Sequence, residues 1–119
     1  MTANTESTVT RLSKHWQCLT SAAGGAGVFF TPDGIIETTF SWGLGTETNN
    51  IAEALALWKG LVIAKNKGIT RLTVLGDSRI VIQAIVEGTL PNHLHLRQLL
   101  TKIQYLVCSF HKSYFFSCA

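Results

Sequence analysis

The sequence contains few cysteines, and their spacing is uninformative. Cys18, Cys108 and Cys118 form no C-x-x-C pair and are odd in number. This pattern argues against a disulfide framework and against the common zinc-binding spacings, and it is typical of a protein from a reducing compartment. Asp and Glu are also scarce, with seven among 119 residues, so a site that needs carboxylates has few candidates.

The chain has no long apolar run. No stretch approaches the roughly 20 apolar residues that span a bilayer, and residues 1–17 lack the apolar segment of a secretory signal peptide. We therefore expect an intracellular protein without a membrane span.

Apolar residues are nevertheless abundant, at 46% of the chain against 14% charged residues. Because a domain usually takes about 100 to 200 residues, we expect one domain over residues 12–119. The preceding residues 1–11, rich in Thr and Ser, are expected to form a disordered tail. A net charge of +3 is compatible with nucleic-acid contact, but the ten Lys and Arg residues form no run typical of a phosphate-binding tail.

Local patterns predict alternating strands and helices. Residues 28–30 and 35–42 have strand character and flank the turn formed by residues 31–34, which predicts a β-hairpin. Apolar residues then recur at helical spacing over residues 50–67, and Gly68 is placed to end that helix as a C-cap.

The second half of the chain continues the alternation. Residues 71–75 predict a strand that leads into a short helix ended by Gly88. A further helix is expected after Pro91, and a final strand is expected over residues 107–116. A strand followed directly by a helix implies parallel strand pairing, so the whole pattern indicates an α/β fold with helices covering a mixed sheet.

Two acidic residues, Glu53 and Asp77, stand where helices begin. Glu53 has a local explanation as the acid of a capping box with Asn50 as the N-cap, and Asp77 could likewise serve a helix start. The alternative is a shared site, because ligand sites in open α/β sheets collect beyond the carboxyl ends of the strands. Two carboxylates there would suit Mg²⁺, which prefers oxygen ligands.

Two motifs favour the shared site over the local explanations. The pattern T-N-N-x-A-E-x-x-A-L over residues 48–57, with G-D-S over residues 76–78, resembles type 1 ribonuclease H domains. The resemblance extends over residues 26–105 and is closest to the reverse-transcriptase-like version common in plant genomes and retroelements. It implies a ribonuclease H-like mixed sheet flanked by helices.

The resemblance also implies a function. Such domains are nucleases (hydrolases) that cleave the RNA strand of RNA–DNA hybrids with two Mg²⁺ ions. Glu53 and Asp77 match two of the catalytic, metal-binding acids. Asn49 matches a nucleic-acid-binding residue that contacts the RNA minor groove, where 2′-hydroxyls distinguish RNA from DNA. The local alternative for Asn49 is a residue that merely begins the helix.

The sequence departs from the family pattern at the other two acids. Residues 16–25, which correspond to the first strand, contain no Asp or Glu, and Glu6 and Asp33 are poorly placed to substitute. No acid matches the fourth position after the final strand. Because the first acid is expected to bridge both metal ions, its loss should remove several kcal/mol of transition-state stabilisation.

We therefore expect a nucleic-acid-binding domain of ribonuclease H type with impaired hydrolysis. The alternative is a non-catalytic module that keeps the fold and binds nucleic acid or a protein partner. A third possibility is a marginally folded chain that associates through an exposed sheet edge. An acid in the strand before Gly24 would favour the enzyme, and none is present.

Overall fold

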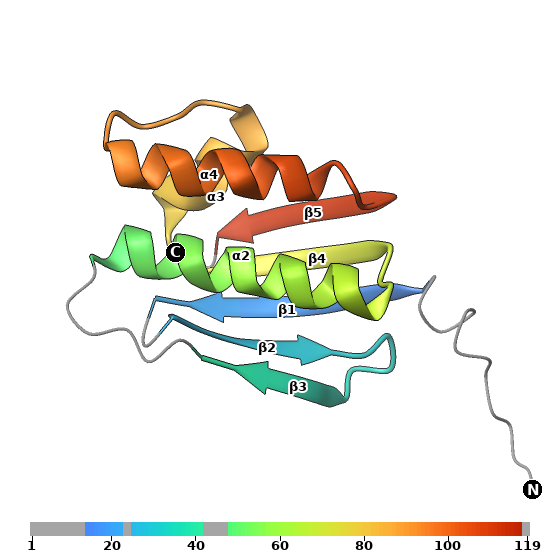
Figure 1. Cartoon of the computed structure of the whole chain (residues 1–119). Helices are drawn as coiled ribbons and strands as arrows, with labels where there is room; N and C mark the ends of the chain where they lie inside the picture. Colours follow the sequence, from blue (N-terminus) through green and yellow to red (C-terminus); the bar gives the residue numbers. More distant parts are fainter. Residues whose placement is uncertain (1–13, 23–24, 42–47, 118–119) are drawn as a thin grey trace, which may run out of the picture.

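The computed structural model describes residues 14–22, 25–41 and 48–117. The expected tail over residues 1–11 lies outside these ranges. The elements in chain order (Figure 1) are β1 (His15–Ser21), β2 (Ala26–Phe30), β3 (Ile36–Phe40), α2 (Asn49–Lys67), β4 (Arg71–Gly76), α3 (Arg79–Glu87), α4 (Leu94–Val107) and β5 (Lys112–Ser117).

The five strands form one mixed sheet in the order β3-β2-β1-β4-β5. β2 is antiparallel to both β1 and β3, whereas β4 is parallel to both β1 and β5. The carboxyl ends of β1, β4 and β5 consequently meet at one edge of the sheet (Figure 1). This arrangement confirms the expected α/β class and the expected parallel pairing.

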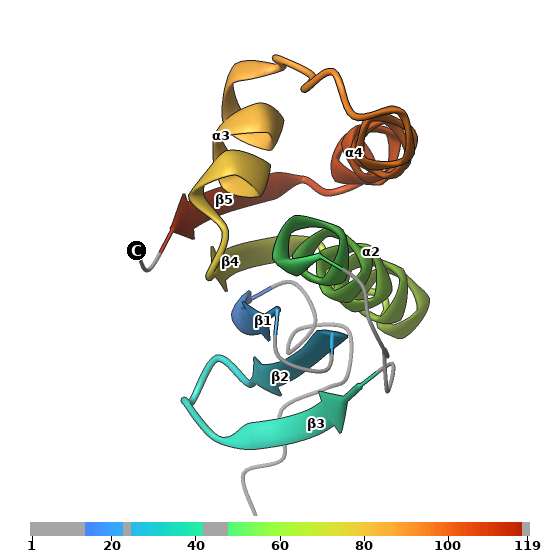
Figure 2. The same cartoon turned by 90° about the vertical axis from the view of Figure 1, so that its left-hand side faces the viewer.

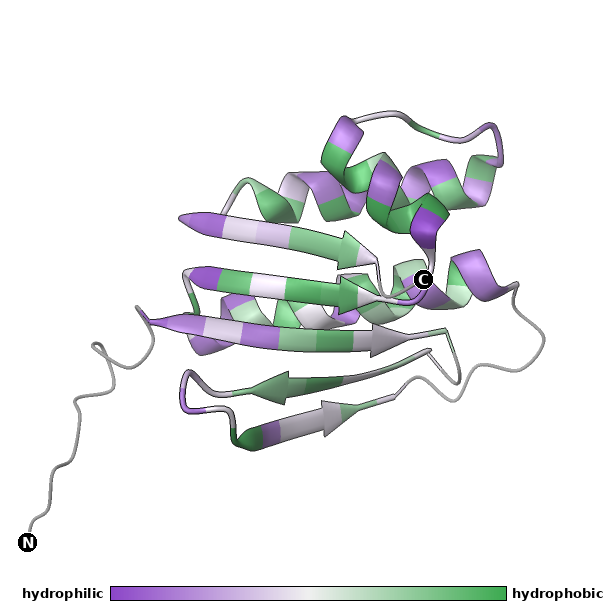
Figure 3. Ribbon diagram, turned by 180° about the vertical axis from the view of Figure 1, so that it is seen from behind, coloured by the Kyte–Doolittle hydropathy of each residue, from purple (hydrophilic) through white to green (hydrophobic). Residues whose placement is uncertain are grey.

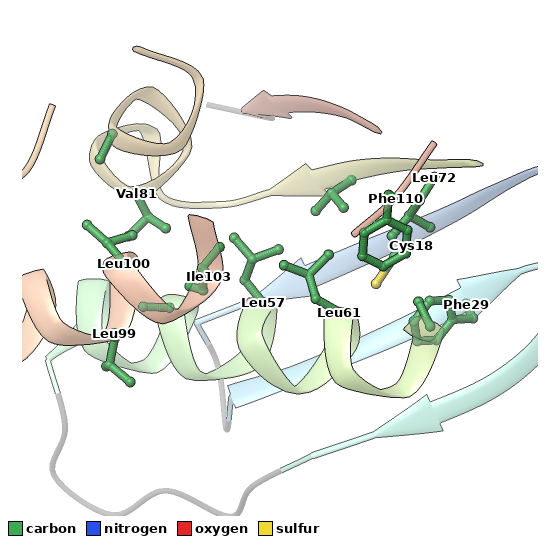
Figure 4. Close-up of a cluster of buried hydrophobic side chains, with 14 of the residues drawn as sticks. Cys18, Phe29, Leu57, Leu61, Leu72, Val81, Leu99, Leu100, Ile103 and Phe110 are labelled. Atoms are coloured by element: carbon green, nitrogen blue, oxygen red, sulfur yellow. The ribbon is translucent and has the colours of Figure 1, made fainter. Parts of the chain in front are cut away.

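Helices α2 and α4 pack on one side of the sheet (Figure 2). Alternate residues of β1 and β4 point into this layer, including Trp16, Cys18 and Leu72, which are at most 1% exposed. They meet apolar side chains of the helices such as Leu57 and Leu100, both fully buried (Figure 4). Burying a side chain of this size contributes roughly 1.5 to 3 kcal/mol, so this layer is the core.

The long helix α2 ends as predicted but begins differently. Gly68 has φ 86°, and its amide donates to the carbonyls of the last turn, as expected for the C-cap. At the other end, the amide of Ile51 donates to Thr48 Oγ1 at 3.3 Å. The N-cap is therefore Thr48, and the prediction of Asn50 was wrong, because the Asn50 side chain instead accepts a hydrogen bond from Ser78.

The carboxyl-terminal strand begins later than predicted. Helix α4 continues through Val107, which packs against the core, and β5 begins at Lys112. His111 therefore lies in the connecting turn, where its amide donates to the carbonyl of Thr70 at 2.8 Å. Apolar residues at the end of α4 resemble the start of a strand, and short apolar runs do not distinguish the two structures.

None of the helices in the described ranges is long and apolar enough to cross a membrane.

Candidate active site at the carboxyl edge of the sheet

The carboxyl ends of β1 and β4 open into a cleft of about 550 Å³. Helices α2 and α3 both begin at this cleft, because the strands that precede them in the chain, β3 and β4, end at this edge of the sheet. Its lining includes Ser21, Asn49, Asn50, Asp77, Ser78 and Arg79. The cleft therefore combines polar side chains with the amino termini of two helices, whose free amides and dipoles favour an anionic ligand.

Glu53 lies beneath this edge and is fully buried. Thr20 Oγ1, at the end of β1, donates a hydrogen bond to Glu53 Oε1. Gly76 makes room for the same carboxyl group, since a Cβ atom added there would lie 2.6 Å from Glu53 Oε1. Glu53 Oε2 is also buried and has no hydrogen-bond partner among the described residues. The capping box considered as the local alternative for Glu53 does not form, because Thr48 is the N-cap and the Glu53 carboxyl accepts a hydrogen bond from Thr20 on β1.

Burial raises the pKa of Glu53 above its ordinary value, and the negative charge of Asp77 raises it further. The hydrogen bond from Thr20 and the backbone amide of Asp77 lower this pKa, but burial prevails. Burial and the nearby Glu53 also raise the pKa of the Cys18 thiol to about 12. Cys18 is therefore a packing residue, because a nucleophilic cysteine needs a lowered pKa.

The raised pKa of Glu53 predicts a pH-dependent stability. The proton is held more tightly in the folded state, so the stabilisation is complete below the unfolded pKa, near 4.5. It is lost as the pH rises toward the folded pKa, at about 1.4 kcal/mol per pH unit. We expect Glu53→Gln to remove this fall in the free energy of unfolding, measured by urea denaturation from pH 4 to 8.

Glu87→Gln is the matched control, because Glu87 is exposed at the end of α3. Its unfolding free energy should follow the wild-type pH profile. Parallel profiles for the wild type and Glu53→Gln would contradict the raised pKa of Glu53.

Asp77 follows β4 directly and is exposed to the cleft. The N-cap of α3 is Ser78, whose Oγ accepts from the Val81 amide at 3.2 Å. Ser78 Oγ also donates to Asn50 Oδ1 at 2.7 Å, which joins the beginnings of α2 and α3. Because Ser78 caps the helix, the structural explanation considered for Asp77 is not needed.

Asn49 is the first residue of α2 and lines the same cleft as Asp77. Thr48 caps the helix, so the Asn49 side chain is exposed and available to a ligand. The structure thus brings Asn49, Glu53 and Asp77 to one edge of the sheet, although Glu53 lies under the surface.

The side chains at this edge do not fit the expected pair of Mg²⁺ ions. Two metal ions held about 4 Å apart need several anionic oxygen ligands. Asp77 supplies one exposed carboxylate, whereas Glu53 is buried, and this burial raises the pKa of its carboxyl group and disfavours the charged form. Across the described ranges, no three His, Cys, Asp or Glu residues gather where they could hold a metal ion. Thr20 occupies the position from which β1 could present another acid.

Sequence reasoning did not identify Thr20 as a site residue. A signal was present, because Trp16, Cys18 and Thr20 alternate along β1 and share its buried side. A polar residue at the inward position of a strand needs a buried partner, and that partner is Glu53.

Residues 13–116 match the family described as reverse transcriptase-like. No curated protein sequence matches the chain. Among solved structures, ribonuclease H1 from the archaeon Halobacterium salinarum is similar, with a TM-score of 0.73 and 24% identity over 87% of this chain and 83% of that one. The N-terminal RNase H domain of a Mycobacterium tuberculosis protein has a TM-score of 0.76 and 24% identity over 88% and 86% of the two chains.

Proposed function

This chain belongs to the reverse transcriptase-like family and has the ribonuclease H fold, and on this basis we propose that it binds RNA–DNA hybrids with strongly impaired hydrolysis of the RNA strand. The observation that carries the proposal is the hydrogen bond from Thr20 to the buried Glu53. This hydrogen bond supports the proposal because a neutral hydroxyl, and not another carboxylate, lies beside Glu53.

Binding is supported by the chemistry of the cleft. The first turns of α2 and α3 contain no acidic residue, so their amides are well suited to phosphate groups. Arg79 adds a positive charge at the same opening. The exposed amide of Asn49 can donate to and accept from a 2′-hydroxyl, which is the group that distinguishes RNA from DNA.

Impaired hydrolysis follows from the charges at the cleft. Phosphodiester cleavage needs groups that stabilise the attacking and leaving oxygens, and each 1.4 kcal/mol of lost stabilisation slows it about tenfold. Asp77 is the one carboxylate among the described residues that line this cleft. We therefore propose that Asp77 and Glu53 are remnants of a catalytic set, and that Asn49 is retained for binding.

The binding proposal predicts distinct effects of two substitutions. Asn49→Ala should weaken binding of a labelled RNA–DNA hybrid more than binding of the matching DNA duplex, because the 2′-hydroxyl contact is lost. Arg79→Gln should weaken both and reduce the salt dependence of binding by about 0.9 in the log–log slope, as expected for one lost phosphate contact. Fluorescence anisotropy at several salt concentrations measures both effects.

Lys65→Gln is the matched control, since it also removes one positive charge but lies in the last turn of α2, at the end opposite Asn49. Equal binding by the wild type, Asn49→Ala and Arg79→Gln would contradict binding at this cleft.

A non-catalytic module is the second candidate, and the Thr20 hydroxyl beside Glu53 is the observation that favours it. The two candidates differ in cleavage of a labelled hybrid with Mg²⁺ or Mn²⁺. Weak cleavage that disappears in both Glu53→Gln and Asp77→Asn identifies the impaired enzyme. Hybrid binding without cleavage identifies the module, and cleavage that survives both substitutions contradicts the assigned acids.

A further inference from the structure

One face of the sheet is free of described helices. Helices α2 and α4 lie on one side of β1 and β4, and the opposite side is open when the molecule is seen from behind (Figure 3). Alternate residues of β1, β4 and β5 point to this open side, because their neighbours along each strand are the more buried ones. We call these outward residues of the three strands the open face.

A row of basic residues crosses the open face. Strand register places His15 beside Arg71, and Arg71 beside Lys112. Adjacent strands lie about 4.8 Å apart, so these side chains extend from neighbouring points of the backbone. Strands β1, β4 and β5 contain no Asp or Glu. Like charges side by side on a sheet are destabilising. An anionic ligand bound at this row would reduce the repulsion between its basic side chains.

Aromatic residues lie next to the basic row. Tyr114 and Phe116 alternate with less exposed residues on β5 and are 46% and 53% exposed. The rings of His15 and Tyr114 have centroids 5.8 Å apart, and His15 is hydrogen-bonded to Thr73. These contacts join the His15 end of the basic row to the exposed Tyr114 ring.

A groove of about 400 Å³ borders the same aromatic residues. β5 lines it with residues of both faces, Ser113 to Phe116, while α3 contributes Ile85 and Val86 and α4 contributes Val107, so the groove follows the edge of β5. Val86 is 61% exposed. An exposed apolar groove beside basic residues can cover the flat base of a nucleotide while the phosphate of the same nucleotide lies at the basic row.

We propose that the open face binds single-stranded nucleic acid, with phosphates at Arg71 and Lys112 and bases stacked on Tyr114 and Phe116. Base stacking on exposed aromatic side chains beside a positive track is the general mode of sequence-tolerant single-strand binding. Along β5, Tyr114 is two residues and Phe116 four residues from Lys112, roughly 6.6 Å and 13 Å, so successive nucleotides of one strand can reach both rings and the basic row.

This proposal goes beyond the hybrid-binding cleft and does not depend on it. The cleft lies at the carboxyl ends of β1 and β4, whereas Arg71 and Lys112 are the first residues of their strands. A second copy of this chain is a poorer occupant of the open face than nucleic acid. A face-to-face pair would bring two basic rows into one interface without an acidic residue from the three strands to balance them.

The aromatic part of the proposal is tested with a labelled 12-nucleotide RNA. We expect the Tyr114→Ala/Phe116→Ala variant to bind at least about tenfold more weakly, because each of the two lost stacking contacts weakens binding by about fivefold or more. Tyr114→Phe keeps the ring and should bind within about twofold of the wild type. Tyr114→Trp should show fluorescence quenching on RNA addition, which a purely structural side chain would not show. Circular dichroism checks that each variant is folded.

The basic part is tested through the salt dependence of the same binding. Arg71→Gln/Lys112→Gln should reduce the log–log slope by about 1.4, as expected for two phosphate contacts to a single strand. Lys65→Gln/Lys102→Gln is the matched control, because it removes the same charge from exposed residues of α2 and α4. That variant should keep the wild-type slope.

Three results would overturn the proposal. The first is RNA binding that is unchanged in both open-face variants but lost in Asn49→Ala, which would place the single strand in the cleft. The second is an absence of measurable binding by the folded wild type. The third is a dimer in sedimentation analysis that dissociates in Tyr114→Ala/Phe116→Ala, which would make the open face an interface between copies.

Discussion

Replacing Thr20 by aspartate is expected to make the stability of this domain depend on divalent cations. The new carboxylate would lie beside Glu53, where the Thr20 hydroxyl now donates a hydrogen bond. Two buried acids at one position repel each other and lack water, so without a cation we expect a loss of about 3 to 5 kcal/mol. This loss would lower the melting temperature by about 4 °C per kcal/mol.

A cation that binds the folded variant should reverse much of this loss. With Asp77 and Glu53 nearby, an aspartate at position 20 would complete a set of three carboxyl groups at the edge of the sheet. Ligand binding at 100 times its dissociation constant stabilises by about 2.7 kcal/mol. Thermal unfolding in EDTA and in millimolar Mg²⁺ or Mn²⁺ measures both the loss and the recovery.

Thr20→Asn is the matched control, because it has nearly the same shape as the aspartate variant without its charge. Neither Thr20→Asn nor the wild type should be stabilised by these cations beyond their general salt effect. A Thr20→Asp variant as stable as the wild type in EDTA, and unaffected by cations, would show that position 20 does not face the two acids. Hybrid cleavage gained in Thr20→Asp alone would identify this position as the main cause of impairment.

Replacing Gly76 by alanine is expected to destabilise the fold by about 1 to 3 kcal/mol through overpacking. The added Cβ would lie 2.6 Å from Glu53 Oε1, 3.1 Å from Ile82 Cδ1 and 3.2 Å from Thr20 Oγ1. Gly76 does not have a positive φ, so the effect comes from the missing space and not from backbone strain. Urea denaturation at pH 7 measures the change.

A double-mutant cycle with Glu53→Ala tests the cause. Removing the Glu53 carboxyl leaves room for the new methyl group, so the double variant should be more stable than the sum of the single effects predicts. Residues in direct contact show interaction energies of about 0.5 to 3 kcal/mol. Additive effects would mean that the space beside Gly76 is set by other atoms.

Both substitutions alter the surroundings of Glu53. Glu53 could be recognised as a candidate site residue from the sequence, whereas Thr20 could not. Glu53 stands out within a motif, and its position three residues after Asn50 indicates a helix start, although the N-cap is Thr48. Thr20 carries no such motif, and its importance appears only when β1 is placed opposite α2. The hydrogen bond between Thr20 and Glu53 joins residues 33 positions apart, and local patterns do not report such distant pairs.

The errors at element ends have a similar origin. Thr48, Asn49 and Asn50 are all capable of capping a helix, and the choice of Thr48 depends on Asn50 being engaged by Ser78 from α3. Likewise, Leu106 and Val107 suit either a helix or a strand, and their contact with the core keeps them in α4. In both places a tertiary contact selected one of several locally acceptable structures.

Local features were readable from the amino-acid order alone. Helical periodicity and the glycines at positions 68 and 88 located α2 and the end of α3, because both signals act within one or two turns of the chain. Strand register and inter-element packing were settled only in three dimensions. They place Thr20 against Glu53 and align Arg71 with Lys112, because such pairings arise from the burial of whole faces and not from neighbouring residues.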